Sequence, residues 1–199
     1  TEPEPTLATP EPVPLLNRIL IVDDDRLVGR AILRLMRKRD AVHVLSGSAA
    51  LEALKTFEAL GSRDQVHCRI NRALCLLALG RPDEARDAFE VGLAQCLERR
   101  LVTIRAAVHV FLLPCFVADN RWSAWDEHLT QAEELLEATS FTDVDVGLMA
   151  RLAGQMAMQA GHRERAVRVL QIARAQWARL QRADELTGIE LMLAHLQSA

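Results

Sequence analysis

The stretch GRPDEARDAFEVGL at residues 80–93 has the pattern of a turn followed by a helix, and the chain repeats that pattern twice. The second copy is NRWSAWDEHLTQAE at residues 120–133, and the third is GHRERAVRVLQIAR at residues 161–174. A period of about forty residues indicates stacked units that bury their apolar faces against one another. We therefore expect the positions in register to pack the repeats together, and stacked helix pairs argue against an enzyme. These positions are Gly80, Asn120 and Gly161; Ala85, Trp125 and Ala166; Phe89, Leu129 and Leu170; and Gly92, Ala132 and Ala173.

Apolar residues at helical spacing extend the repeats in both directions. Gly80 and Gly161 supply the left-handed residue that commonly ends a helix. Pro114 lies inside a predicted helix, so we expect a kink, or a break around Leu112–Cys115. The sequence therefore predicts a mostly α fold of helical hairpins, with a last helix that caps the stack. The predicted helices are 66–79, 83–98, 103–118, 123–138, 144–160, 163–180 and 183–196.

Composition narrows the classes of function. The formal net charge is −3, and the basic cluster Arg34, Arg37, Lys38 and Arg39 is typical of the last turn of a helix, so we expect no nucleic-acid partner. No apolar run reaches the eighteen or so residues that span a membrane. The four cysteines form no C-x-x-C pair, which favours buried thiols over a zinc site. An acidic, proline-rich N-terminus is unlike a secretory signal, so we expect a cytoplasmic protein.

The N-terminal part differs in character from the rest. Residues 1–16 contain most of the prolines and predict a disordered tail. Residues 17–60 follow the order strand, helix, strand, helix, with strands at 18–22 and 41–45. Two parallel strands with open edges are too few to be stable alone. We expect this segment to dock on the helices, to pair with a second copy in a homodimer, or to remain partly ordered.

The helical part, residues 62–199, resembles the tetratricopeptide repeat family. Gly80, Ala85, Phe89 and Gly92 fall where that family has its small-small-large-small pattern, although these copies are longer and Trp125 replaces a small residue. The resemblance implies an array whose concave face binds a protein partner. Similar stretches follow bacterial serine/threonine kinases and other multidomain regulators. The alternative is an irregular helical bundle without a partner.

Residues 17–60 resemble part of a response-regulator receiver domain. ILIVDDDRLV at 19–28 is similar to that family's first strand and acidic turn, and VLSGSAALEAL at 44–54 to its second strand and helix. In the family, the paired carboxylates after the first strand hold Mg²⁺, which would make Asp23 and Asp24 metal ligands. The alternative for these aspartates is an acidic helix N-terminus that binds no metal.

The remainder of a receiver domain has no counterpart in the sequence. If residues 65–70 are aligned with its third strand, Arg69 takes the place of the phosphorylated aspartate, and arginine cannot form an acyl phosphate. Asp64 lies nearby but lacks a preceding apolar strand. We therefore expect no phosphoacceptor. A strand at 64–72 would support a receiver, whereas a helix there would exclude it.

These observations predict a non-catalytic signalling adaptor or scaffold. It would bind a protein partner, need no cofactor, and belong to bacterial two-component (phosphorelay) or kinase signalling. The alternative is a Mg²⁺-dependent phosphoacceptor response regulator with a degenerate receiver, in which Asp64 accepts the phosphoryl group. A third interpretation is a piece of a longer regulator in which the helices are purely structural. The sequence does not identify the partner.

Overall fold

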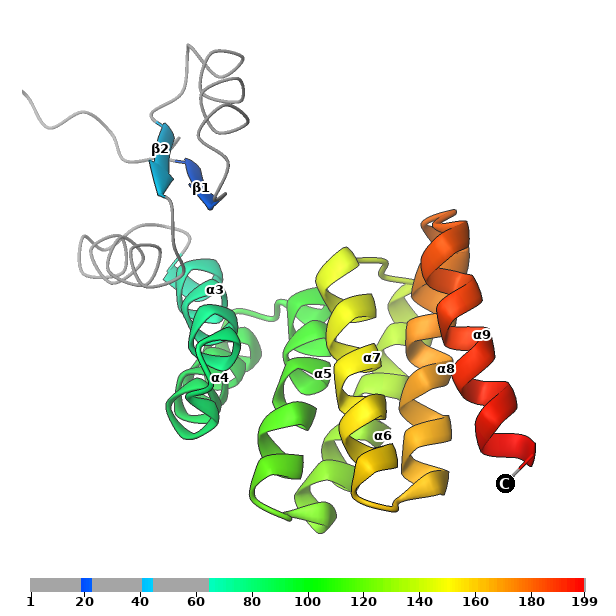
Figure 1. The fold of residues 1–199 in the computed structure, drawn as a ribbon. Helices are drawn as coiled ribbons and strands as arrows, with labels where there is room; N and C mark the ends of the chain where they lie inside the picture. Colours follow the sequence, from blue (N-terminus) through cyan, green and yellow to red (C-terminus); the bar gives the residue numbers. More distant parts are fainter. Residues whose placement is uncertain (1–18, 23–40, 45–64, 199) are drawn as a thin grey trace, which may run out of the picture.

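The computed structural model describes residues 19–22, 41–44 and 65–198, and from residue 65 onward every element that it describes is a helix (Figure 1). All seven helices begin and end within two residues of the predicted positions. The elements are β1 (Ile19–Val22), β2 (Ala41–Val44), α3 (Gln65–Ala78), α4 (Pro82–Glu98), α5 (Val102–Ala118), α6 (Trp122–Thr139), α7 (Val144–Gln159), α8 (Arg163–Arg179) and α9 (Ala183–Ser198).

The two strands pair in parallel, with Ile19 opposite Ala41 and Val22 opposite Val44. Both strands coincide with apolar runs from which strands were predicted. The tail at residues 1–16 and the helices predicted after each strand lie outside the described residues. The receiver-like order of this segment therefore stays a prediction.

Residues 65–70 form the beginning of α3 and not a third strand. Val66, Ile70 and Ala73 recur at helical spacing, and all three are buried. Arg69 therefore lies in a helix, and the alignment of this stretch with the third strand of a receiver is wrong.

The seven helices pack in pairs that follow the order of the chain. α3 packs on α4, α5 on α6 and α7 on α8, and α9 packs on α8. The second and third hairpins form two layers, because α5 packs on α7 and α6 touches α8 (Figure 1). The first hairpin joins them differently, mainly through α4 against α5, with only a small contact from α3. The hairpins are thus successive neighbours, but the steps between them are unequal.

Helix α5 lies at the centre of the described array and is surrounded by α4, α6 and α7. Its residues 106–117 are all buried, as expected for a helix that is apolar all round. Pro114 lies within this stretch, yet α5 is a single helix from Val102 to Ala118. The break predicted at Leu112–Cys115 does not occur. Packing on several sides outweighs the roughly 3 kcal/mol that an interior proline costs a helix.

All six connections between these helices contain a residue with positive φ. In five of them, the next amide also bonds to a carbonyl five residues back, as Arg81 N does to Leu76 O at 3.0 Å. This is the Schellman arrangement, and it occurs both within and between hairpins. The left-handed residues are Gly80, Arg100, Asn120, Ser140, Gly161 and Gln181. The predictions for Gly80 and Gly161 are confirmed.

The connection between α6 and α7 is built differently and depends on a buried side chain of α8. Gln176 is only 1% exposed. Its amide donates to the Phe141 carbonyl at 3.2 Å and accepts from the Asp143 amide at 2.9 Å. Asp143 caps α7, accepting from the amides of Asp145 and Val146. Gln176 therefore fixes the residues that begin α7.

Two glycines let α7 lie very close to α8. A Cβ atom at Gly147 would come within 2.7 Å of the Trp177 ring, and one at Gly154 within 2.6 Å of Leu170.

At the end of the array, α9 buries Ile189 and Leu193 and leaves Thr187 and Glu190 exposed. The outer side of α9 is not wholly polar, however, because Leu191 is 68% exposed.

Candidate functional site

Asp23 and Asp24, which the resemblance to a receiver makes metal ligands, lie outside the described residues, as does Asp64, the phosphoacceptor of the alternative interpretation only. Within the part that the structure describes, no three His, Cys, Asp or Glu side chains gather as a metal site would need. Cys115 is buried, and burial raises the pKa of its thiol to about 12. That thiol therefore stays protonated and is a poor nucleophile.

The structure places the repeat positions in two groups. Gly80, Asn120 and Gly161 occupy exposed turns, with φ of 71°, 54° and 79°. The other nine are buried in the second helix of each hairpin: Ala85, Phe89 and Gly92 in α4; Trp125, Leu129 and Ala132 in α6; and Ala166, Leu170 and Ala173 in α8. Corresponding residues are thus alike in being buried, including Trp125, which takes the place of alanine.

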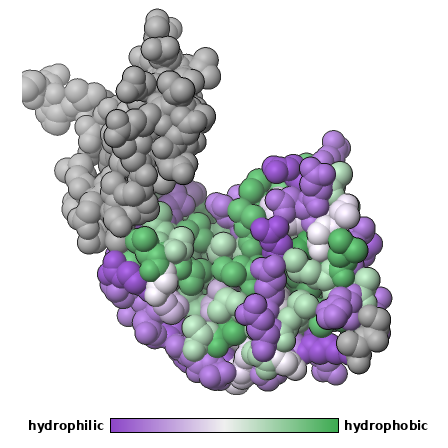
Figure 2. All heavy atoms as spheres, in the orientation of Figure 1, coloured by the Kyte–Doolittle hydropathy of each residue, from purple (hydrophilic) through white to green (hydrophobic). Residues whose placement is uncertain are grey.

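One side of α7 carries apolar residues that are only partly buried, and three of them, Leu148, Met149 and Met156, also pack against the core. Leu148, Met149, Leu152 and Met156 are half-buried there, while Gly147 and Gly154 face α8 on the other side. We call these four residues the α7 face. Figure 2 views the array from the side on which α7 lies in front, and both hydrophobic and hydrophilic residues are visible on that side. Methionine and leucine side chains adapt readily to different apolar partners.

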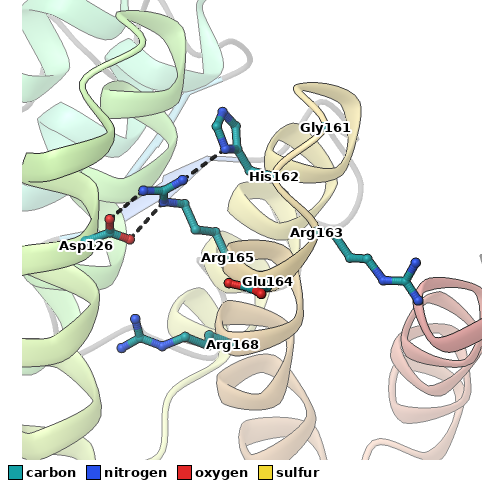
Figure 3. Close-up of a pocket in the computed structure, with 7 residues that line it drawn as sticks. All are labelled: Asp126, Gly161, His162, Arg163, Glu164, Arg165 and Arg168. Atoms are coloured by element: carbon teal, nitrogen blue, oxygen red, sulfur yellow. Dashed lines mark hydrogen bonds and ion pairs between the residues drawn. The ribbon is translucent and has the colours of Figure 1, made fainter.

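A cavity of about 570 Å³ opens between α6 and α8, at the turn before α8 (Figure 3). Arg165 crosses it: Nε and Nη2 bond to the Asp126 carboxylate at 2.9 and 2.6 Å, and Nη1 lies 2.9 Å from His162 Nδ1. The Arg165 guanidinium lies 5.3 Å from the Trp122 ring, which also contacts His162. The hydrogen bond to Asp126 raises the pKa of Arg165.

A second arginine of this cavity, Arg168, also joins α8 to α6. Arg168 bonds to the Glu133 carboxylate at 2.5 and 3.3 Å and to Thr130 at 3.3 Å. Arg163 points away from Asp126, toward α9 (Figure 3). Arg165 and Arg168 thus both pair with carboxylates of α6, so these contacts hold the second and third hairpins together beside the cavity.

A pair of histidines joins the two helices of the central hairpin. His109 in α5 and His128 in α6 have their Nδ1 atoms 3.0 Å apart, and the Phe116 ring packs on His128. Burial, followed by the charges of His128 and Arg105, lowers the pKa of His109 to about 4. Burial likewise lowers the pKa of His128. No motif in the sequence identifies these two histidines as a pair. His109 lies eleven residues before Asn120 and His128 eight residues after it, so both fall on facing helices of an antiparallel hairpin, and this placement could have predicted their contact.

Comparison of the chain with protein-family models, curated proteins and solved structures finds no match. None of the described helices is long and apolar enough to cross a membrane.

Proposed function

We propose that this chain is a non-catalytic adaptor that binds a protein partner through a tetratricopeptide-like helical array. The observation that carries the proposal is the α7 face, a strip of half-buried apolar residues on a helix whose opposite side packs tightly on α8. Apolar strips that stay partly accessible on a packed scaffold are typical of protein-binding surfaces.

The distribution of charge also favours the side of α5 and α7 as the partner-binding surface. Helix α6 contains five acidic residues and no lysine or arginine, and α8 contains five arginines and one glutamate. By contrast, α5 contains a single charged residue, Arg105, and α7 contains only Asp145 and Arg151. Because this surface is nearly uncharged, we expect the partner to bind it through the apolar side of an amphipathic helix and not as a charged peptide.

A role in bacterial two-component or kinase signalling rests on the resemblance of residues 17–60 to a receiver. The alternative, a Mg²⁺-dependent phosphoacceptor, would gain from a strand at residues 65–70, where α3 lies instead. No described residue favours that alternative. Treatment of the full chain with acetyl phosphate and Mg²⁺ should therefore leave its mass unchanged, whereas a stable phosphoryl adduct would refute the adaptor proposal.

Whether a partner binds through the α7 face can be tested with two matched substitutions in the full chain, each of which introduces one negative charge. Leu152→Glu puts a carboxylate on the α7 face, and Gln171→Glu puts one on an exposed position of α8. We expect affinity capture with wild type and Gln171→Glu to recover the same proteins, and Leu152→Glu to lose them. Circular dichroism checks that each variant is folded. Identical captured proteins from all three chains would contradict the proposal.

A further inference from the structure

The strongest unassigned feature is the pair of imidazoles between α5 and α6. We propose that His109 and His128 together bind one transition-metal ion, best Cu²⁺, through their Nδ1 atoms. This site is separate from the α7 face and does not depend on the proposed adaptor function.

The spacing of the two nitrogens suits ligation of a single ion. Their separation is 3.0 Å, and imidazole nitrogens bind such ions at about 2.0–2.1 Å. An ion equally distant from both would therefore have an N–metal–N angle of about 95°, near the right angle of tetragonal Cu²⁺ and below the tetrahedral angle of Zn²⁺. Cu²⁺ also has the highest affinity of the divalent ions in this series for nitrogen ligands.

Proton balance allows both nitrogens to bind at once. Without metal, one Nδ1 donates a hydrogen bond to the other. On binding, that imidazole carries its hydrogen on Nε2 instead, so two neutral ligands result and no proton is released.

The surroundings set the character of the site. His109 is 8% exposed, whereas His128 is half-buried, so an ion reaches the pair from the His128 side. Arg105 acts on His109, and Arg121 and Glu127 act on His128. Two guanidiniums against one carboxylate weaken the binding of a dication. With no third ligand among the described residues, the remaining coordination positions go to water.

The test is a Cu²⁺ titration of the full chain without a histidine tag, at pH 7.5, followed by calorimetry and electron paramagnetic resonance. We expect one site with two nitrogen ligands in wild type. His162→Ala, which removes the histidine stacked on Trp122, is the matched control and should retain that site. His128→Ala should weaken binding at least tenfold.

A second measurement needs no variant. Substoichiometric Cu²⁺ should broaden the imidazole proton resonances of His109 and His128 before those of the other histidines. Binding that is unchanged in His128→Ala, or broadening that begins at other histidines, would overturn the proposal. A spectrum with a single nitrogen ligand would overturn it as well.

Discussion

The close approach of α7 and α8 predicts that one substitution, glycine to alanine, has opposite effects at two helical positions. At Gly188 in α9, an added Cβ would meet no atom within 4 Å. Alanine is favoured over glycine inside a helix by about 1 kcal/mol. Gly188→Ala should therefore raise the free energy of unfolding by about 0.5–1 kcal/mol.

At Gly147 the same methyl group has no room. It would lie 2.7, 2.8 and 3.0 Å from three atoms of the Trp177 ring, and Trp177 is only 1% exposed, so its rigid ring cannot move aside. Such overpacking costs about 1–3 kcal/mol. This cost exceeds the helical gain, so Gly147→Ala should lower the free energy of unfolding by up to about 2 kcal/mol.

Urea denaturation of the full chain, followed by circular dichroism at the helical band, measures both variants against wild type. The difference between Gly147→Ala and Gly188→Ala should be about 1–3 kcal/mol, with midpoints on opposite sides of wild type. Midpoints shifted equally and in the same direction would refute the packing described for α7 and α8.

Three further outcomes follow from other contacts. Gln181→Gly should stabilise the chain by up to about 1 kcal/mol, seen in thermal melting, because φ at Gln181 is 56° and non-glycine residues are strained there; a lower melting temperature would contradict this. Gln176→Ala should lower the free energy of unfolding, measured by urea denaturation, by about 2–4 kcal/mol, because it leaves the Phe141 carbonyl and the Asp143 amide without this partner. A decrease of less than about 1 kcal/mol would contradict this role of Gln176. Stability should fall by up to about 3 kcal/mol as pH drops from 6.5 to 4, because unfolded His109 binds a proton at its ordinary pKa whereas the folded pKa is about 4. His109→Leu should flatten that pH profile, and an unchanged slope would exclude His109 as its cause.

The sequence predicted the helices well because their determinants are local. Apolar spacing places each helix, and Gly80 and Gly161 mark two ends through their backbone freedom. Arg100 and Gln181 adopt the same left-handed conformation, but nothing in their side chains indicates it. Those turns are imposed by the packing of the helices on either side.

The unequal steps between hairpins could not be predicted in the same way. Whether α4 or α3 packs on α5 depends on which surfaces fit, and the repeat positions do not indicate it, because all of them except Asn120 are small or apolar. The long, mostly apolar run at 106–117 did indicate that α5 lies at the centre of the array, because a helix that is apolar on all sides must be surrounded by other helices. The role of Gln176 depends on contacts with residues more than thirty positions away, so no local pattern in the sequence predicts it.

The neighbour-by-neighbour packing of the described helices has a consequence for how the chain folds and opens. Because substantial packing joins only adjacent or next-adjacent helices, each contact closes a short loop, and such chains fold rapidly. Opening should begin at the ends and spread inward. Helix α9, held mainly by α8, should then exchange its amide hydrogens soonest and α5 latest.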